Sequence, residues 1–469
     1  MRERFAGDPH RPAYHFLPPA NWMNDPNGLI HWRGQYHLFY QYNPNGAFWG
    51  TMHWGHAVSP DMVRWRDLPI ALAPGPEPYD AAGVYSGITV VHEGAPTIIY
   101  TATAGERYEP SVALAVGDEA LVTWRKDPAN PVLRPPTDPD IHDFRDHSAW
   151  REGEWWYQVI GAGIRGVGGA ILLYRSRDLR AWEYLGPACV GTSEESGETW
   201  ECPDLFELGG RHVLLVSPIP LGRAIYFTGA YADHRFTPEL QSELDLGGSL
   251  YAPQTFRDAH GRRILFGWLR EERPRTAQEA AGWSGVMSLP RVLTLLPDGS
   301  LGQAPAAEVE TLRGRHTALA AMPLAPGLTA LPADLPGDRL EVLAEIDVGS
   351  AAAAGLALRA TPDSAERTLV YYDRPGARLV VDRTHASLDS ETARDVRACP
   401  LALAPGEPLR LRVFVDRSAI EVFANGRACL ASRVYPTRMD ARGAQLFAEG
   451  AGARLLALDM WEMTAVWPA

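Results

Sequence analysis

The stretch WMNDPNGLIHWRGQYHLFYQYN, residues 22–43, holds two short strand patterns separated by Arg33-Gly34. The first pattern opens with polar residues and a proline, and the second is strongly apolar. Glycine in a tight turn supplies the positive φ that other residues resist. This stretch therefore predicts a β-hairpin that turns at Gly34.

The same pattern occurs four more times along the chain. The copies are VYSGITVVHEGAPTIIYTATAG from Val84, DFRDHSAWREGEWWYQVIGAG from Asp143, WECPDLFELGGRHVLLVSPIP from Trp200 and LYAPQTFRDAHGRRILFGWLRE from Leu250. The five turn glycines are Gly34, Gly94, Gly153, Gly210 and Gly261, at spacings of 51 to 60 residues. Each unit has room for about four strands, which predicts a five-bladed β-propeller. A second echo, SPDMVRW at 59–65 and SRDLRAW at 176–182, supports the repeat.

The texture of the sequence changes near Pro297, where tryptophan becomes rare and alanine more frequent. Alternating patterns such as RLEVLAEIDV from Arg339 and LRLRVFVDR from Leu409 then indicate an antiparallel sandwich. We therefore predict an all-β chain in three parts. Residues 1–296 form the propeller, 297–314 a connector and 315–469 a C-terminal β-sandwich.

The charge balance excludes some classes of partner. There are 44 basic and 57 acidic side chains, a formal charge of −13, which argues against a nucleic-acid partner. No apolar run reaches the ~18 residues of a membrane span, and the amino end lacks the apolar segment of a signal peptide. We expect a soluble cytoplasmic protein with no membrane partner. The four cysteines lack the spacing of a metal site or a disulfide framework.

Three acids fall at similar places on the repeat. Asp25 and Glu201 each lie nine residues before their turn glycine, and Asp146 lies seven before its own. The inner strand of each blade lines the central channel, so the repeat brings these carboxylates to one rim. Clustered carboxylates are costly unless a site uses them. Two close carboxylates are what glycoside hydrolysis requires, one as nucleophile or base and the other as acid.

These residues resemble motifs of glycoside hydrolase family 32, the β-fructofuranosidases. The matching segments are Asn21 to Gly28 (NWMNDPNG), Phe144-Arg145-Asp146, Glu201-Cys202, Gln41 to Pro44 (QYNP), Trp49-Gly50, Tyr85-Ser86-Gly87, Trp283-Ser284-Gly285 and, in the sandwich, Asp416-Arg417-Ser418 with Glu421-Val422-Phe423. The resemblance covers nearly the whole chain and follows the order of the family. It implies a five-bladed propeller, a C-terminal sandwich, retention of configuration, and neither metal nor cofactor.

The resemblance also assigns roles to residues. Asp25 would be the nucleophile, Asp146 the stabiliser of the transition state and Glu201 the acid/base. The implied fructose pocket consists of Asn24, Gln41, Trp49, Tyr85, Ser86, Arg145 and Trp283. We expect Arg145 to keep the neighbouring Asp146 ionised.

The sequence departs from the family pattern at three places. His147 stands where proline is usual after the Arg-Asp pair, Thr51 replaces a common asparagine, and Ser249-Leu250 stand where Asp-Phe is usual. The catalytic acids are unchanged, so these departures leave open the substrate rather than the chemistry. We expect His147 to pack in the interior rather than to contact a sugar.

The predicted function is release of fructose from terminal β-D-fructofuranosides such as sucrose, raffinose or short fructans. Three alternatives stay open: fructosyl transfer that makes short oligofructosides, an inverting arabinan- or xylan-type furanosidase, and a non-catalytic carbohydrate-binding protein. The expected partner is a small sugar, and the sandwich would brace the propeller or join two copies as a homodimer.

Overall fold

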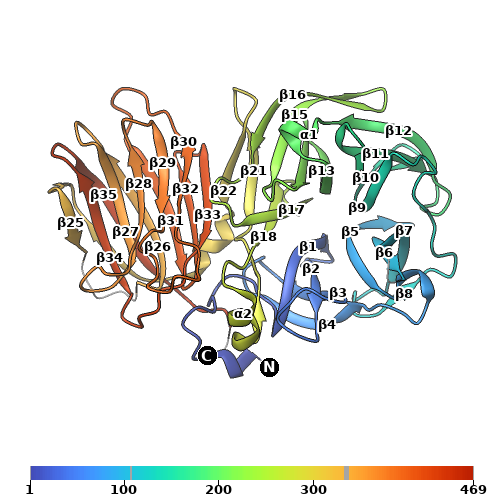
Figure 1. Ribbon diagram of the computed structural model, residues 1–469, viewed down its shortest axis with the longest axis horizontal. Coiled ribbons are helices and arrows are strands. Elements are labelled where there is room, and N and C mark those ends of the chain that lie inside the picture. The colour runs from blue at the N-terminus through green and yellow to red at the C-terminus, as the bar shows by residue number, and fades with distance from the viewer. Residues whose placement is uncertain (1, 106–107, 332–336, 468–469) are drawn as a thin grey trace.

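The five predicted hairpins lie around a common axis in the computed structural model, which describes residues 2–105, 108–331 and 337–467 (Figure 1). Each hairpin continues into one antiparallel sheet, and the five sheets are the blades of a propeller. The inner strands of the blades face one another around its middle (Figure 1). The first three blades contain β1 (Asn21–Trp32), β2 (Gln35–Asn43), β3 (His53–Ser59) and β4 (Arg66–Leu72); β5 (Gly83–His92), β6 (Ala95–Ala104), β7 (Glu109–Gly117) and β8 (Trp124–Lys126); and β9 (Ile141–Glu152), β10 (Trp155–Ile164), β11 (Gly168–Ser176) and β12 (Glu183–Val190). The last two contain β13 (Thr199–Leu208), β14 (Arg211–Ile219), β15 (Ile225–Ala232) and β16 (Arg235–Glu243); and β17 (Leu250–Arg257), β18 (Arg263–Leu269), β20 (Val286–Met287), β21 (Arg291–Leu295) and β22 (Leu301–Pro305).

The repeat signals behave as predicted. All five turn glycines have positive φ, between 58° at Gly153 and 83° at Gly210. The second echo forms two matching loops, because the indole N–H of Trp65 donates to the Met62 carbonyl at 2.9 Å and that of Trp182 donates to the Leu179 carbonyl at 2.8 Å. Met62 and Leu179 share the same left-handed φ of 63°. The two segments are therefore structural equivalents.

The ring closes through a short parallel pairing. β19 (Trp283–Ser284), which follows blade five, pairs with β1 of the first blade. The fifth sheet also extends further than predicted, since β22 pairs with β21 and ends at Pro305 rather than at residue 296. Alternation across five residues was too short to separate this strand from the predicted connector. The connector is the 3-10 helix η3 (Ala307–Leu312).

The described residues of the C-terminal sandwich form two antiparallel sheets, of seven and six strands. Their strands are β23 (Arg313–Leu319), β24 (Met322–Pro323), β35 (Arg454–Met463), β26 (Arg339–Asp347), β31 (Leu409–Asp416), β32 (Ala419–Ala424) and β33 (Ala428–Arg433) in the first, and β25 (Gly327–Ala330), β34 (Gly443–Glu449), β27 (Ala353–Ala360), β28 (Thr368–Asp373), β29 (Arg378–Asp382) and β30 (Val396–Pro400) in the second. The remaining described helices are η1 (Arg2–Phe5), η2 (Pro78–Asp80), α1 (Ser193–Ser196) and α2 (Arg275–Ala281). The chain is therefore all-β, with helices confined to short connections.

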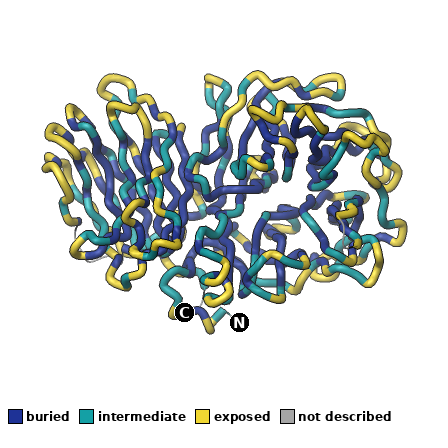
Figure 2. Tube along the Cα trace, viewed as in Figure 1, coloured by how far each residue is buried: buried dark blue, intermediate teal, exposed yellow. Residues whose placement is uncertain are grey.

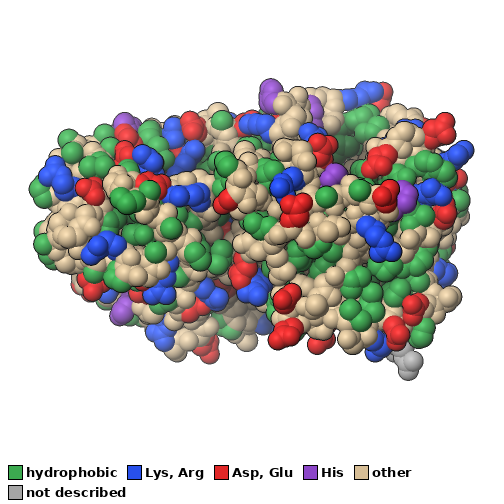
Figure 3. Space-filling model, turned by 90° about the horizontal axis from the view of Figure 1, so that it is seen from above, with side chains coloured by type: hydrophobic (Ala, Val, Ile, Leu, Met, Phe, Trp, Pro, Cys, Tyr) green, Lys and Arg blue, Asp and Glu red, His purple; other side chains and the backbone are tan. Residues whose placement is uncertain are grey.

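Burial follows the layers. The strands that face another sheet are buried, and the exposed residues gather at the outer turns (Figure 2). Basic and acidic side chains are interspersed on the face seen in Figure 3. Within the described ranges, no helix has the length and apolar character of a membrane span.

A buried charge network joins the two domains. His15, in the segment before the first blade, lies 2.9 Å from Asp416 and 3.1 Å from Glu421 of the sandwich, and all three side chains are fully buried. Arg291 of blade five pairs with the same Glu421 and, at 2.9 Å, with Asp245. Burial alone would lower the pKa of His15, but its hydrogen bonds to the two carboxylates raise it to about 9. Asp416 and Glu421, which belong to the sandwich segments that resemble the family motif, therefore connect the two domains.

Asp416→Asn is expected to lower the free energy of unfolding by about 3–5 kcal/mol, because the substitution removes a negative charge and leaves the buried charge of His15 less well compensated. Asp416 also accepts the backbone N–H groups of Ala13, Tyr14 and His15. Urea denaturation followed by tryptophan fluorescence measures the loss. The exposed pair of Arg275 and Glu279 supplies the control, because Glu279→Gln should cost under about 0.5 kcal/mol. A loss below about 1 kcal/mol in Asp416→Asn would contradict the inferred role.

Candidate active site

A β-bulge interrupts every inner strand at the same level. In each hairpin the inner strand has one residue more than its partner between two paired positions, which is the definition of a bulge. The extra length falls at 24–25 in β1, 85–86 in β5, 146 in β9, 202–203 in β13 and 252–253 in β17. Asp146, Cys202 and Ala252 there have left-handed φ of 60°, 48° and 48°. Asn24, Asp25, Tyr85, Ser86 and Asp146 thus lie where the regular ladder is broken, and Glu201 directly precedes such a break.

The three acids meet around one cysteine. The Sγ atom of Cys202 lies 3.5 Å from Oδ2 of Asp25 and 3.5 Å from Oδ2 of Asp146, so these two oxygens are at most 7 Å apart, the sum of those distances. Glu201 is the preceding residue. Burial and the three carboxylates raise the pKa of the Cys202 thiol, which therefore stays protonated at neutral pH and can donate to a carboxylate. The structure brings together the acids that the repeat placed on one rim.

Asp25 is held by two donors. The Ser86 hydroxyl donates to its Oδ2 at 2.7 Å, and the Asn24 amide donates to its Oδ1 at 3.0 Å. Asn24 is itself oriented by the indole N–H of Trp22, which donates to its carbonyl at 2.7 Å. The carboxylate of Asp25 thus has a defined orientation.

Glu201 has different partners. Its Oε1 lies 2.8 Å from the guanidinium of Arg145, and its Oε2 accepts the Tyr251 hydroxyl at 2.6 Å. Burial raises the pKa of Glu201 to about 7, because it outweighs the opposing effect of Arg145, and the charge of Asp146 adds to the rise. A carboxyl with this pKa can donate a proton near neutral pH and take it back.

Arg145 influences two of the acids. Its guanidinium forms an ion pair with Glu201. Burial raises the pKa of Asp146 above the ordinary value, whereas Arg145 lowers it and the backbone N–H of Cys202 donates to Asp146 Oδ2 at 2.9 Å. Arg145 thus favours the ionised form of Asp146 in the predicted direction, but burial has the larger effect on this enclosed side chain.

The other predicted pocket residues differ in how far their side chains are exposed. Trp49 is 55% exposed, and its ring lies 6.1 Å from that of Tyr85, which stacks at 6.1 Å on Tyr108. These rings form an accessible aromatic strip beside Ser86. Gln41 lies deeper, at 2% exposure, and donates to the Val84 carbonyl at 3.1 Å.

Trp283 does not reach the pocket. Its side chain is fully enclosed, and its indole N–H donates to Asp8 at 2.6 Å. The predicted contact of Trp283 with fructose is therefore wrong in this structure. Its position in the ring closure, which sequence spacing does not reveal, turns its ring into the interior.

Trp268 lies at the site instead. Its ring centroid is 5.7 Å from that of Trp22 and 6.5 Å from that of Tyr251, so it adjoins partners of both Asn24 and Glu201. Its buried indole N–H has no hydrogen-bond partner among the described residues. Because this nitrogen is enclosed, the ring of Trp268 rather than its N–H is what adjoins the site. The sequence analysis did not identify Trp268, Tyr251 and Tyr108 as site residues. Tyr251 directly precedes the bulge of blade five, as Glu201 precedes that of blade four, so the repeat could have identified it.

Of the three departures, two have clear places. Ser249 donates to Glu272 at 2.6 Å, and Glu272 pairs with Arg383 of the sandwich, so Ser249 belongs to the domain junction. His147 is buried behind Asp146 and contacts Thr101 at 3.1 Å, as the packing interpretation expects. The Thr51 carbonyl lies 3.0 Å from Nδ1 of His53.

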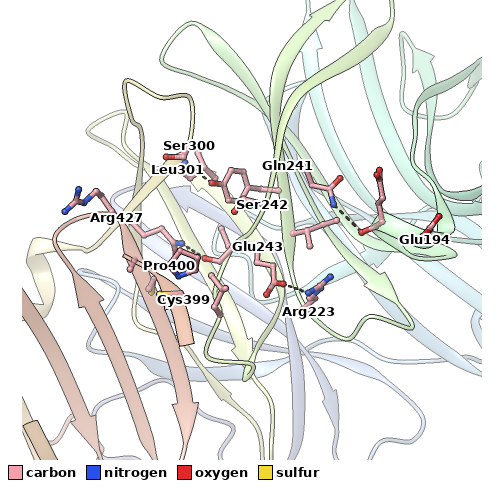
Figure 4. Close-up of a pocket in the computed structure, with 18 residues that line it drawn as sticks. Glu194, Arg223, Gln241, Ser242, Glu243, Ser300, Leu301, Cys399, Pro400 and Arg427 are labelled. Atoms are coloured by element: carbon pink, nitrogen blue, oxygen red, sulfur yellow. Dashed lines mark hydrogen bonds and ion pairs between the residues drawn. The ribbon is translucent and has the colours of Figure 1, made fainter. Parts of the chain in front are cut away.

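A separate cavity lies at the domain junction. About 860 Å³ opens where blade four meets the sandwich, between residues such as Gln241 and Glu243 on one side and Cys399 and Arg427 on the other (Figure 4). Arg223 and Glu243, which form an ion pair, both line its blade-four side. Its lining includes none of the three clustered acids, so chemistry rather than cavity size identifies the candidate site.

Comparison with known proteins agrees with this geometry. The N-terminal domain model of the glycosyl hydrolases family 32 matches residues 15–305, and its C-terminal model matches residues 308–462. The chain belongs to glycoside hydrolase family 32. Among its relatives are a sucrose-6-phosphate hydrolase of Zymomonas mobilis, 34% identical over 94% of this chain and 90% of the relative, and a raffinose invertase of Escherichia coli, 35% identical over 98% and 96%. Fructan 1-exohydrolase IIa of Cichorium intybus is a structural neighbour of this family 32 chain, with a TM-score of 0.90, 29% identity and 98% of both chains covered.

The unusual environment of Glu201 can be measured directly. In protein labelled with ¹³C at the glutamate carboxyl, we expect one resonance to titrate at about pH 7, and Glu201→Gln should remove it. Arg145→Met should move the midpoint to higher pH, because the guanidinium opposes the rise. The exposed Glu198→Gln is the control and should leave this resonance in place. A Glu201 resonance that titrates near pH 4.5 would contradict the inferred environment.

Proposed function

We propose that this protein is a β-fructofuranosidase that releases fructose from the non-reducing end of sucrose, raffinose or short fructans. Asp25 attacks the anomeric carbon of fructose while Glu201 protonates the departing oxygen. Glu201 then deprotonates a water molecule, which cleaves the fructosyl ester of Asp25 and releases fructose with its configuration retained. Asp146 accepts hydrogen bonds from fructose hydroxyls as positive charge develops on the ring.

The proposal rests on one observation: the carboxyl groups of Asp25 and Glu201, in the same site, have different environments. Ser86 and Asn24 hold the carboxylate of Asp25 in place, whereas the pKa of Glu201 lies at about 7. Retaining hydrolysis needs one carboxylate that attacks and a second that exchanges a proton. The arrangement of Asp25 and Glu201 supports this chemistry.

The proposed fructose pocket keeps six of the predicted residues. Asn24, Ser86 and Arg145 touch the acids directly and can extend their polar contacts to sugar hydroxyls. Trp49 and Tyr85 offer aromatic faces to the C–H groups of a sugar ring. The Gln41 amide donates to the Val84 carbonyl and so helps to hold the strand that carries Tyr85.

The rivals make different predictions. Fructosyl transfer shares the same intermediate, so only products separate it from hydrolysis: equal free fructose and free glucose from concentrated sucrose support hydrolysis. A furanosidase of the arabinan or xylan type releases no fructose. A binding protein without turnover usually lacks one acid, and here all three meet around Cys202. The named activities of the relatives favour hydrolysis of small fructosides.

Asp25→Ala is expected to lower kcat on sucrose by roughly 10³-fold or more, about 4 kcal/mol of barrier, because no other group can form the ester. Azide should restore turnover of an activated aryl fructoside and yield the α-fructosyl azide, since it attacks from the side left vacant. Unchanged turnover in Asp25→Ala would refute the proposal.

Methanol tests retention in the unmodified enzyme. An ester on Asp25 is expected to transfer to methanol and give methyl β-D-fructofuranoside, which keeps its configuration and is identified by NMR. Formation of the α anomer of the methyl fructoside would contradict retention and the ester on Asp25.

The two tryptophans provide a matched pair. Trp268→Phe is expected to raise KM for sucrose about 3- to 10-fold, because the smaller ring weakens the packing on Trp22 and Tyr251, which contact Asn24 and Glu201. Trp283→Phe removes a bond to Asp8 far from the sugar, so KM should stay constant while the melting temperature falls. A raised KM in Trp283→Phe together with an unchanged KM in Trp268→Phe would show that Trp283, not Trp268, acts on the sugar.

The preferred substrate is best decided by initial rates on sucrose, sucrose 6-phosphate, raffinose, inulin and levan side by side. The cytoplasmic location and the pairing of two copies through the sandwich stay predictions from the sequence.

A further inference from the structure

The Thr101 hydroxyl makes three contacts beneath the acids. Thr101 lies in β6, the second strand of blade two, and is 1% exposed. Its Oγ1 accepts the backbone N–H of Asp146 at 2.8 Å, donates to the Ser86 carbonyl at 3.2 Å and lies 3.1 Å from Nε2 of His147. One hydroxyl therefore joins two neighbouring blades.

The number of protons on the Thr101 hydroxyl determines which partner donates in each of its three hydrogen bonds. A hydroxyl has one proton and two lone pairs. The Asp146 N–H takes one lone pair and the Ser86 carbonyl takes the proton, so His147 completes the set by donating from Nε2. His147 is 3% exposed, and burial lowers its pKa to about 3, so the ring is neutral and carries a single proton. We assign that proton to Nε2.

Both ends of this network lead to an acid. Ser86, whose carbonyl Thr101 holds, donates through its own hydroxyl to Asp25. Asp146 is the extra residue of its bulge, between the paired residues Arg145 and His147, and its φ is 60°. A bulge leaves the extra residue without a ladder bond, so the Thr101 hydroxyl is what fixes the Asp146 backbone.

We propose that Thr101, completed by the proton on His147 Nε2, is a positioning residue that sets the Asp146 carboxylate relative to Asp25. The inference rests on the roles given to those acids in the proposed function. The hydroxyl, not the shape of the side chain, does the positioning. The histidine that replaces the usual proline after Arg145-Asp146 supplies the third bond.

The test compares Thr101→Val, which keeps the shape, with Thr101→Ser, which keeps the hydroxyl. On sucrose, Thr101→Val should lower kcat about 10- to 100-fold with KM nearly unchanged, since a small misplacement of reacting groups costs rates of this order. Thr101→Ser should stay close to the parent enzyme. Thr103→Val is the control, because Thr103 is buried on the same strand and its hydroxyl has no partner among the described residues.

His147 gives an independent route if Thr101→Val does not fold. His147→Ala should lower kcat, His147→Gln should restore it by offering an amide donor, and the effects of His147→Ala and Thr101→Val should not add, because they break one network. A kcat in Thr101→Val equal to that of Thr103→Val, or His147→Gln as slow as His147→Ala, would overturn the inference. Normal turnover in Asp25→Ala would instead overturn the proposed function, so the two failures are distinguishable.

Discussion

One extra residue at the same level of each inner strand is the constraint on which the site depends. A bulge breaks the ladder, turns a side chain towards the rim and leaves a backbone N–H to be satisfied from elsewhere. The neighbouring blade supplies the acceptor: Thr101 for Asp146, Asp146 for Cys202 and Ser217 for Ala252. The bonds that satisfy the bulges also tie successive blades together, so the catalytic geometry and the closure of the ring have a common origin.

Crowded carboxylates make this rim unfavourable by itself, and the surrounding structure offsets the repulsion. Arg145 neutralises part of the charge at Glu201, and the Cys202 thiol stands between the other two acids. Away from this rim, the buried network of His15, Asp416 and Glu421 joins the propeller to the sandwich. The sandwich therefore braces the propeller, and its described residues make none of the contacts to the three acids reported above.

Much of the fold was predictable because its signals are local. A glycine in a hairpin turn, or a Ser, Asp and Trp at set offsets, specifies a conformation within a few residues. The acids could be placed for the same reason, since a repeat carries equivalent positions to equivalent heights. Trp268 and Trp283 show the limit, because fifteen residues separate them and only the path of the ring closure decides which one faces the pocket.

The sequence by itself determined the five hairpins, the sandwich, the three acids and the family, since each depends on residue type and spacing. The tertiary structure alone decided the partners: that Arg145 pairs with Glu201, that Trp268 rather than Trp283 adjoins the acids, and that β22 completes the fifth blade. The pKa of Glu201 belongs to this second group as well. Burial and the charges of other blades set it, and both exist only once segments far apart in the chain have closed into a ring.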